Sequence, residues 1–292
     1  RKKTGKEYSL STNSDLYQYF LETGETKNLT EGMMGYDTTP RFSKSGRYLA
    51  WLSMEHDGYE SDMNRIFIMD MENGEKKHLT VNWDYAADNI AWSPNEKAIF
   101  FTAPYLGCTP MFKIDIENLK IDTVASGEYD YAAIVPVNDD TIITLRHSLQ
   151  EPNELYAISN GETSKLSNVN DELLAQLNNV TVNKVMVPTT DGKEMTTWVV
   201  LPPNFDSSKK YPAILYCQGG PQQPVSQFWS YRWNLRLMAS QGYIVIAPNR
   251  RGLPGFGSEW NAQISGDYPG QNMKDYLAAV DFMKKEPYVD AE

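Results

Sequence analysis

A short segment that alternates between apolar and polar residues recurs through the first 160 residues at nearly constant spacing. The four copies are LYQYF from Leu16, IFIMD from Ile66, MFKID from Met111 and LYAIS from Leu155. Their starting positions lie 50, 45 and 44 residues apart. A period of two residues predicts β-strands, because successive side chains of a strand point to opposite faces of its sheet. The alternation therefore excludes a helical repeat.

A second series of segments recurs in phase with the first. The pairs are NLT from Asn28 with HLT from His78, and FSKSG from Phe42 with WSPNE from Trp92, each 50 residues apart. Several short strands in a unit of about 45 residues are typical of a β-propeller blade, whereas a β-sandwich does not repeat its own sequence. Residues 1–182 are thus predicted to form three to four propeller blades, with further blades expected upstream of Arg1.

The pattern changes in residues 183–292, after a short helical segment at Asn170–Val180. Asp191-Gly192 is a strong hairpin signal, and apolar strand patterns begin at Ala213 and Ile244. Helical patterns span Ser230–Ser240 and Asn272–Lys285, and the second is predicted to bury Met273, Tyr276, Leu277, Val280 and Met283. Strands separated by helices predict a parallel sheet that is covered on both faces. The predicted fold is therefore a partial β-propeller, made of C-terminal blades, followed by the N-terminal part of an α/β domain.

The chain has a net charge of −11, and all of it lies in the predicted propeller half. Residues 1–184 hold 17 Lys and Arg against 28 Asp and Glu, whereas the remainder holds 10 of each. Such acidity disfavours binding to nucleic acid and to anionic membranes. No run of about 18 apolar residues is present, so no membrane-spanning segment is predicted.

Neither a cofactor nor a metal is predicted. The glycines of RGLPGFG, residues 251–257, do not follow the G-x-G-x-x-G spacing of dinucleotide-binding loops, and no helix pattern starts directly after them. An acidic loop with His56, Asp57, Glu60 and Asp62 lacks the ligand spacing of an EF-hand. We predict instead that this loop is solvated or faces a cavity.

Two consecutive glycines, Gly219 and Gly220, follow the apolar strand pattern that starts at Ala213. In a sheet of this class, ligands bind beyond the carboxyl ends of the strands. Hydrolases with such a sheet place backbone N–H groups there to stabilise the oxyanion of a tetrahedral intermediate, and a side chain would crowd the reacting carbon. A tight turn without a catalytic role is the alternative interpretation.

Four segments of the second half, taken together with the preceding propeller, resemble the prolyl oligopeptidase family of serine peptidases. They are KKYPAILYCQGGPQ, GYIVIAPNRRGLPGFG, QISGDYPGQNMKDYLAAVDF and EPYVD. The propeller segment SMEHDGYESDMNRIFIMD resembles the acylaminoacyl-peptidase and dipeptidyl-peptidase branches. The resemblance implies an α/β-hydrolase domain and assigns the oxyanion donor to the Gly220 backbone N–H. It also places Gln218 where family members commonly carry His or Tyr.

The resemblance implies a Ser-Asp-His triad, but this sequence holds no serine in a G-x-S-x-G motif. Ser258 lies in FGSEW and Ser265 in QISGD, and all three histidines precede residue 183. We therefore expect the triad downstream of Glu292, and expect the 292-residue chain alone to be inactive. The expected activity of the intact protein is release of dipeptides from the N-terminus of short peptides. An acylaminoacyl-peptidase, an esterase and a non-catalytic binding module are the alternatives.

The resemblance also suggests further binding residues. Glu55, supported by Glu60, is predicted to hold the free α-amine of a peptide. Arg251, next to Arg250, either contacts substrate carbonyls or pairs with propeller acids. Trp229 either forms an aromatic wall near the substrate with Tyr231 and Trp233 or packs in the core. The family further implies a periplasmic or secreted location, with the cytoplasm as the alternative, and allows a homodimer.

Overall fold

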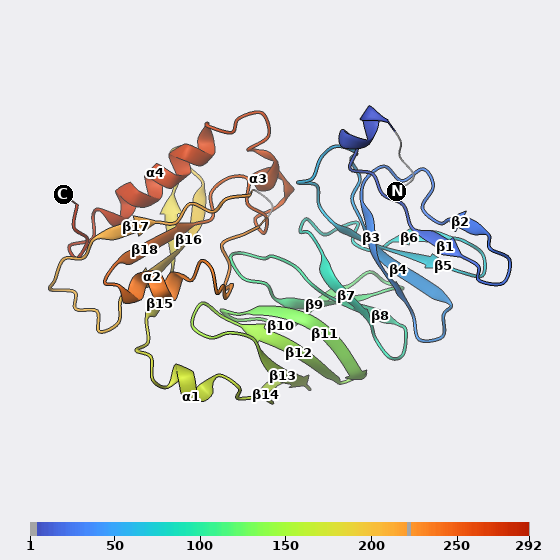
Figure 1. Cartoon of the computed structure of the whole chain (residues 1–292), viewed down its shortest axis with the longest axis horizontal. Helices are drawn as coiled ribbons and strands as arrows, with labels where there is room; N and C mark the ends of the chain where they lie inside the picture. Colours follow the sequence, from blue (N-terminus) through green and yellow to red (C-terminus); the bar gives the residue numbers. More distant parts are fainter. Residues whose placement is uncertain (1–4, 221–222, 292) are drawn as a thin grey trace.

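The computed structural model describes residues 5–220 and 223–291. It consists of two parts that lie side by side, one made of antiparallel sheets and one built on a mixed sheet with helices (Figure 1). A 3₁₀ helix, η1 (Lys6–Ser9), precedes the first strand. In the described ranges, no helix is both long enough and apolar enough to cross a membrane.

The first part contains three four-stranded antiparallel sheets and one two-stranded sheet. The small sheet pairs β1 (Tyr17–Tyr19) with β2 (Thr26–Asn28). The first large sheet has β3 (Asp37–Phe42), β4 (Tyr48–Ser53), β5 (Arg65–Asp70) and β6 (Lys76–His78). The second has β7 (Asp88–Trp92), β8 (Ala98–Thr102), β9 (Met111–Asp115) and β10 (Ile121–Ala125). The third has β11 (Asp130–Asn138), β12 (Thr141–His147), β13 (Glu154–Ser159) and β14 (Glu162–Lys165).

Each large sheet is a meander in which neighbours in the chain are neighbours in the sheet. This arrangement confirms the predicted propeller blades, and the four repeated alternating segments form β1, β5, β9 and β13. Apolar side chains of adjacent blades pack together: Leu52 and Ile66 of the first blade share a core with Ile99 and Phe101 of the second. Because β8 lies between packed blades, all five of its residues are buried, which a simple alternation does not predict.

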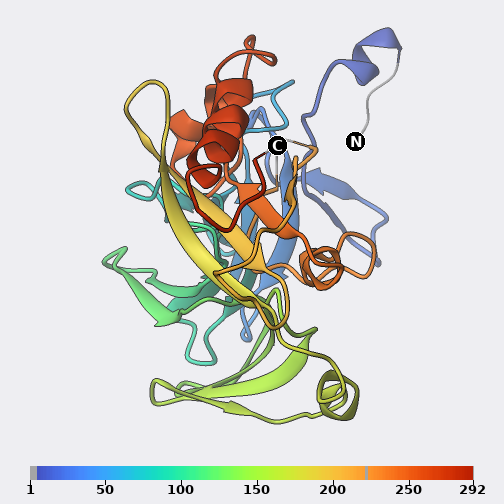
Figure 2. The ribbon, with the colours of Figure 1, turned by 90° about the vertical axis from the view of Figure 1, so that its left-hand side faces the viewer.

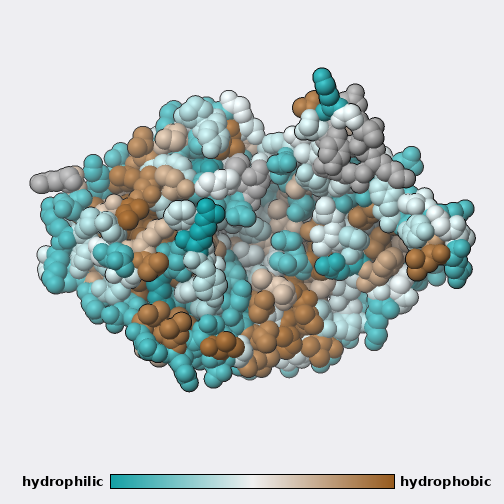
Figure 3. Space-filling view, viewed as in Figure 1, coloured by the Kyte–Doolittle hydropathy of each residue, from teal (hydrophilic) through white to brown (hydrophobic). Residues whose placement is uncertain are grey.

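Apolar side chains are also exposed on the propeller. Among the first strands of the blades, β7 contacts both β3 and β11. Val135 and Val137 of β11 and Phe42 of β3 are exposed and line an open hollow of about 780 Å³. Figure 3 shows apolar surface at the lower edge of the molecule, over the blade that contains β11. The hollow is formed by inner strands from more than one blade, so it belongs to the propeller and not to the boundary between the two parts.

The second part is a four-stranded sheet in the order β15-β16-β18-β17, with helices on both faces. Its strands are β15 (Thr181–Pro188), β16 (Glu194–Leu201), β17 (Ala213–Leu215) and β18 (Ile244–Pro248). The helices are α1 (Asp171–Leu174), which precedes it, α2 (Leu235–Ser240), α3 (Ser258–Ala262) and α4 (Gln271–Met283). Only β17 and β18 are parallel, which corrects the predicted parallel sheet. The sheet starts at Thr181, two residues before the boundary predicted from the sequence.

Alternate residues of β16 face opposite layers of the second part. Trp198 and Val200 pack with Leu235 and Ala239 of α2, and their neighbours on β16 pack against α4. Figure 2 shows α4, in red, and α2, in orange, on opposite sides of these strands. The sheet is therefore covered on both faces, as predicted.

The buried face of α4 differs from the predicted one. Tyr276 and Met283 are buried as expected, but Met273 and Leu277 are 47% and 59% exposed. The helix is rotated so that Asp275 points inward, where it is fully buried. Its partner there is Arg251, in the loop after β18. This ion pair, and not the apolar side chains, determines which face of α4 is buried.

Candidate active site

A cavity of about 970 Å³ lies at the boundary between the propeller and the mixed sheet. The propeller contributes Asp88, Asn89 and Thr102 to its wall, and the second part contributes Gln218, Gly219 and Trp233. The second-part residues follow the carboxyl end of β17, which is the edge at which ligands bind in sheets of this class. A volume of this size is typical of a site for a small organic ligand or a short peptide.

The glycine loop after β17 forms one side of this cavity. Gly220 has a backbone φ of +72°, a conformation that favours glycine, and no atom lies within 4 Å of where its Cβ would be. Gly219 lines the cavity directly. The glycine pair thus makes a turn and brings the backbone of Gly219 to the cavity wall, and its role as an oxyanion donor stays a prediction. Pro221 and Gln222, which follow, lie outside the described residues.

Gln218 is held on both its side chain and its backbone. Its Oε1 accepts a hydrogen bond from Tyr216 Oη at 2.9 Å, and its Nε2 donates to the Gly219 carbonyl at 3.1 Å. Its own carbonyl accepts from Arg250 Nη2 and from Tyr276 Oη, both at 3.2 Å. The side chain therefore braces the loop, while the backbone carbonyl points to buried donors.

The predicted amine-binding acids lie in different environments. Glu55 pairs with Arg65 at 2.9 Å, and its side chain is 64% exposed. Glu60 lines a smaller cavity of about 230 Å³, which shares Asp88 and Pro104 with the large one. Sequence reasoning missed Asp88, which lies on the walls of both cavities. Its position in the sequence was the available signal, because Asp88 starts β7, the strand that ends at the repeated segment from Trp92.

The acidic loop that contains these glutamates is organised by its aspartates. Asp62 accepts hydrogen bonds from the backbone N–H groups of Glu55 and His56 at 2.7 and 2.9 Å. Burial raises the pKa of Asp62, but these N–H groups and that of Met63 outweigh it, so the pKa is lowered overall. The loop is therefore partly exposed and internally bonded, rather than simply solvated.

Arg251 is part of the protein interior rather than of the cavity wall. It is 1% exposed, and both its terminal nitrogens bond to Asp191 at 2.7 Å. Its Nε lies 3.1 Å from Asp275 Oδ2, and Asp275 is completely buried. These two carboxylates belong to the second part itself, so the predicted pairing with propeller acids is replaced by nearer partners from the hairpin and α4. Arg251 does not line the large cavity, and its contact with substrate carbonyls stays a prediction.

The aromatic candidates are divided between surface and cavity. The helix predicted from Ser230 starts only at Leu235, so the aromatic residues before it lie in a loop. Tyr231 is 86% exposed, and Trp233 lines the large cavity. Trp229 does not line it; its ring makes an edge contact with Tyr231. Of the three aromatic candidates, Trp233 is thus the one on the cavity wall, which Tyr216 and Phe228 also line.

A buried contact joins the two parts beside the cavity. The Asp130 carboxylate accepts a hydrogen bond from Ser226 Oγ at 2.6 Å and from the Gln227 backbone N–H at 3.3 Å. Asp130 starts β11 of the propeller, whereas Ser226 and Gln227 belong to the loop between β17 and α2. All three residues are buried. The propeller therefore holds the loop that continues from the glycine pair.

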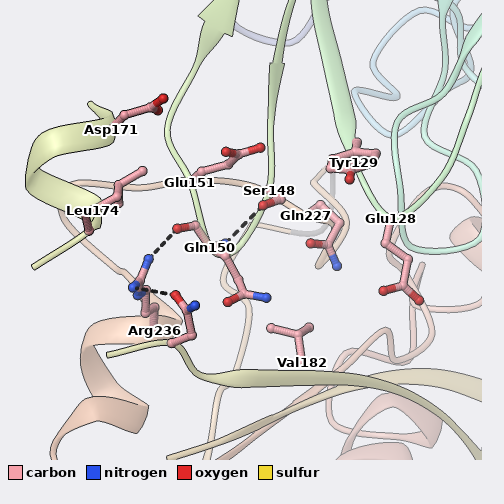
Figure 4. A pocket seen from close by; sticks show the side chains of 12 residues that line it. Glu128, Tyr129, Ser148, Gln150, Glu151, Asp171, Leu174, Val182, Gln227 and Arg236 are labelled. Atoms are coloured by element: carbon pink, nitrogen blue, oxygen red, sulfur yellow. Dashed lines mark hydrogen bonds between the residues drawn. The ribbon is translucent and has the colours of Figure 1, made fainter. Parts of the chain in front are cut away.

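A third cavity, of about 570 Å³, lies at the joint where the last blade, α1 and α2 meet (Figure 4). Arg236 of α2 is 6% exposed and donates hydrogen bonds to the backbone carbonyls of Gln150 and Asn178. These bonds tie α2 to the turn after β12 and to the segment that leaves the propeller. The glycine loop does not line this cavity, so the joint and the candidate site are separate.

Comparison with known proteins gives a family. A family model described as prolyl oligopeptidase family matches residues 229–292. The chain is also 55% identical over 294 residues to dipeptidyl-peptidase 5 of Porphyromonas gingivalis, covering 100% of this chain and 43% of that protein. The chain belongs to the prolyl oligopeptidase family. A more distant relative is dipeptidyl-peptidase 5 of Schizosaccharomyces pombe, 31% identical across 96% of this chain and 41% of that protein.

Solved structures of the prolyl oligopeptidase family share this fold. Acylaminoacyl peptidase of Pyrococcus horikoshii superposes with a TM-score of 0.80 at 22% identity, covering 95% of this chain and 42% of that one. At this identity the likeness concerns the fold. The chain spans less than half the length of the curated family members it matches.

Proposed function

We propose that this chain belongs to a serine peptidase that releases dipeptides from the free N-terminus of short peptides. The observation that supports it most is that Gln218 and Gly219 of the glycine loop line a cavity whose wall also includes Asp88 of the propeller. Backbone N–H groups at this loop suit an oxyanion, and a carboxylate across the cavity suits an ammonium group. The name dipeptidyl-peptidase 5, carried by the two relatives above, agrees with this activity.

The proposed reaction is acyl transfer to a serine. The serine oxygen adds to the scissile carbonyl while a histidine takes its proton, and backbone N–H donors stabilise the oxyanion that forms. The oxyanion then collapses, the C–N bond breaks, and the histidine gives its proton to the leaving amine. This sequence contains no serine in the motif expected for that nucleophile. The proposal therefore includes that the longer protein supplies the serine and histidine, as the greater length of the relatives allows.

Asp88, with Glu60 in support, is the proposed anchor of the peptide amine. Within residues 5–220 and 223–291, neither carboxylate forms an ion pair, whereas Glu55 is already paired with Arg65. An ammonium group that leaves water needs a charged acceptor, and Asp88 provides it on the wall of the large cavity. The structure thus favours Asp88 over Glu55, which sequence reasoning had preferred.

The test uses the full-length protein and two matched peptide substrates, one with a free N-terminus and one N-acetylated. We expect the wild type to cleave the free peptide, and Asp88→Asn to lower kcat/KM for it by about 10- to 100-fold, the range for a hydrogen bond to a charged group. Activity on the acetylated peptide should not change. Kinetics of peptide cleavage measure both.

Glu55→Gln is the matched control, because it removes a carboxylate of the same loop that is paired elsewhere. A loss with Glu55→Gln and none with Asp88→Asn would return the anchor to Glu55. A wild type that prefers the acetylated peptide is an acylaminoacyl-peptidase. If the wild type binds both peptides but cleaves neither, the protein is a binding module and the proposed peptidase function is wrong. The homodimer allowed by the family resemblance stays a prediction, and the molar mass in solution tests it.

A further inference from the structure

Arg250 is a buried cation that has no carboxylate partner. It is 2% exposed, and its side chain donates to Tyr276 Oη at 3.2 Å, to the Arg251 carbonyl at 2.7 Å and to the Gln218 carbonyl at 3.2 Å. All three acceptors are neutral. Among the described residues, no Asp or Glu forms an ion pair with it. The neighbouring Arg251, by contrast, is neutralised by two carboxylates.

An unpaired buried charge is costly for the folded state, because desolvation is not repaid by an opposite charge. The fold of this region does not require the charge of Arg250, since Arg251 and its acids already join β18 to α4 and to the hairpin. What Arg250 adds is a contact with the glycine loop. The Cζ atom of Arg250 lies 5.7 Å from the centre of the Tyr276 ring, and the Tyr276 hydroxyl also donates to the Gln218 carbonyl.

The contact fixes the direction of a catalytic peptide group. The C=O of Gln218 and the N–H of Gly219 belong to one planar trans peptide unit, so they point in opposite directions. Arg250 and Tyr276 draw the carbonyl toward the buried side of the loop. The Gly219 N–H is thereby turned to the opposite side, and Gly219 lines the large cavity.

We propose that Arg250, together with Tyr276, is the positioning residue of the glycine loop: by holding the Gln218 carbonyl, the two side chains fix the backbone from which a glycine N–H is offered to the oxyanion. This inference rests on the proposed peptidase function. Gly220 supplies the positive φ that the turn needs, and Gly219 is on the cavity wall.

The test compares transition-state binding with substrate binding in the full-length enzyme. A peptide aldehyde becomes tetrahedral when the serine oxygen adds to its carbonyl, so its affinity depends on the oxyanion donor. We expect Arg250→Met to weaken aldehyde binding and kcat by about 100-fold and Tyr276→Phe by about 10-fold, with KM nearly unchanged. Arg250→Lys, which keeps a donor and the charge, should restore part of both.

Arg236→Met is the matched control, because Arg236 is also buried and bonds to backbone carbonyls, but at the other cavity. We expect it to lower thermal stability without changing the ratio of aldehyde affinity to KM. If the Arg250 and Tyr276 variants lower stability only and leave that ratio at the wild-type value, the positioning role is wrong. If the wild type cleaves no peptide, the proposed function fails instead, and the two failures are distinct.

Discussion

The two cysteines show how far one residue's surroundings set its chemistry. Cys108 is 7% exposed at the boundary between the parts, and burial raises the pKa of its thiol to about 12. Cys217 is exposed, lines the large cavity and immediately precedes the glycine loop. Burial raises its pKa as well, but the nearby Arg250 opposes the rise. Because the thiolate is the reactive form, the two sites should differ in reactivity.

We expect N-ethylmaleimide at pH 7.5 to modify Cys217 at least about tenfold faster than Cys108, since a higher pKa leaves less thiolate. Mass spectrometry of the labelled peptides measures both rates. Cys217→Ser should remove the fast reaction and leave the slow one. Equal rates at the two cysteines would contradict the buried position of Cys108.

Much of the site at this scale follows from residue type, and part of it does not. The glycine pair at the end of a strand was identifiable because only glycine tolerates both the positive φ and the close approach of a ligand. The ion pairs of Arg251 and the position of Asp88 on the cavity wall were not, because they depend on residues 24 to 60 positions away or on the other part of the molecule. Charge and position in the sequence alone do not reveal which arginine is already paired.

At the scale of elements, Arg251 joins the end of β18 to three other elements. It leaves β18, bonds to Asp191 in the β15–β16 hairpin and to Asp275 in α4, and stacks 4.3 Å from the Trp260 ring centre of α3. Arg251 lowers the pKa of Asp191 far below its ordinary value, chiefly by hydrogen bonding. Asp191 is therefore ionised at neutral pH, and removal of Arg251 leaves both carboxylates without their cation.

We expect Arg251→Met to lower the free energy of unfolding by about 3–5 kcal/mol, because Asp275 would remain buried and unpaired. Urea denaturation at pH 7 measures it. Lys193→Met is the control, since Lys193 pairs with Glu259 at the surface and should cost less than about 1 kcal/mol. Equal costs for the two variants would show that the buried network contributes no more than a surface pair.

Strands were easier to predict than helices in this chain. The repeated alternation located β1, β5, β9 and β13, because each of these strands has one more buried and one less buried side. The face of α4 was misjudged because Met273 and Leu277 look like core residues, whereas the helix position is set by the bond of Asp275 to Arg251. The hairpin predicted at Asp191 is confirmed, but the antiparallel pairing of β16 with β18 was missed, because an apolar strand has the same composition in either direction.

At the scale of the whole molecule, Asp130 forms a contact between the two parts and lies beside a titratable histidine. His147 lies beside it in the paired strand, with its Nε2 at 3.7 Å from Asp130 Oδ2, and its Nδ1 bonds to Asn153 at 2.8 Å. Burial lowers the pKa of His147, but the hydrogen bond and charge of Asp130, with help from Asn153, outweigh it. The pKa of His147 is therefore raised.

A raised pKa means that protonated His147 stabilises the folded state. Its contribution is fully present below the ordinary histidine pKa of about 6.5 and is lost as pH rises through the folded value. We expect the melting temperature to fall between pH 6 and pH 8 more steeply in the wild type than in His147→Gln, measured by scanning calorimetry. Asp130→Asn should flatten the same slope. An identical slope in all three proteins would contradict this linkage.

The cavity wall is divided between two separately built parts, and this has a consequence for how specificity evolves. Asp88, Asn89 and Thr102 come from propeller strands and turns, whereas the glycine loop and its supporting Arg250 come from the mixed sheet. Substitutions in the blades can therefore remodel one side of the cavity while the glycine loop and the contacts that hold it stay intact. Exchanging the propeller between family members should transplant substrate preference as a module, and the Asp130 contact with Ser226 is the seam such a chimera must preserve.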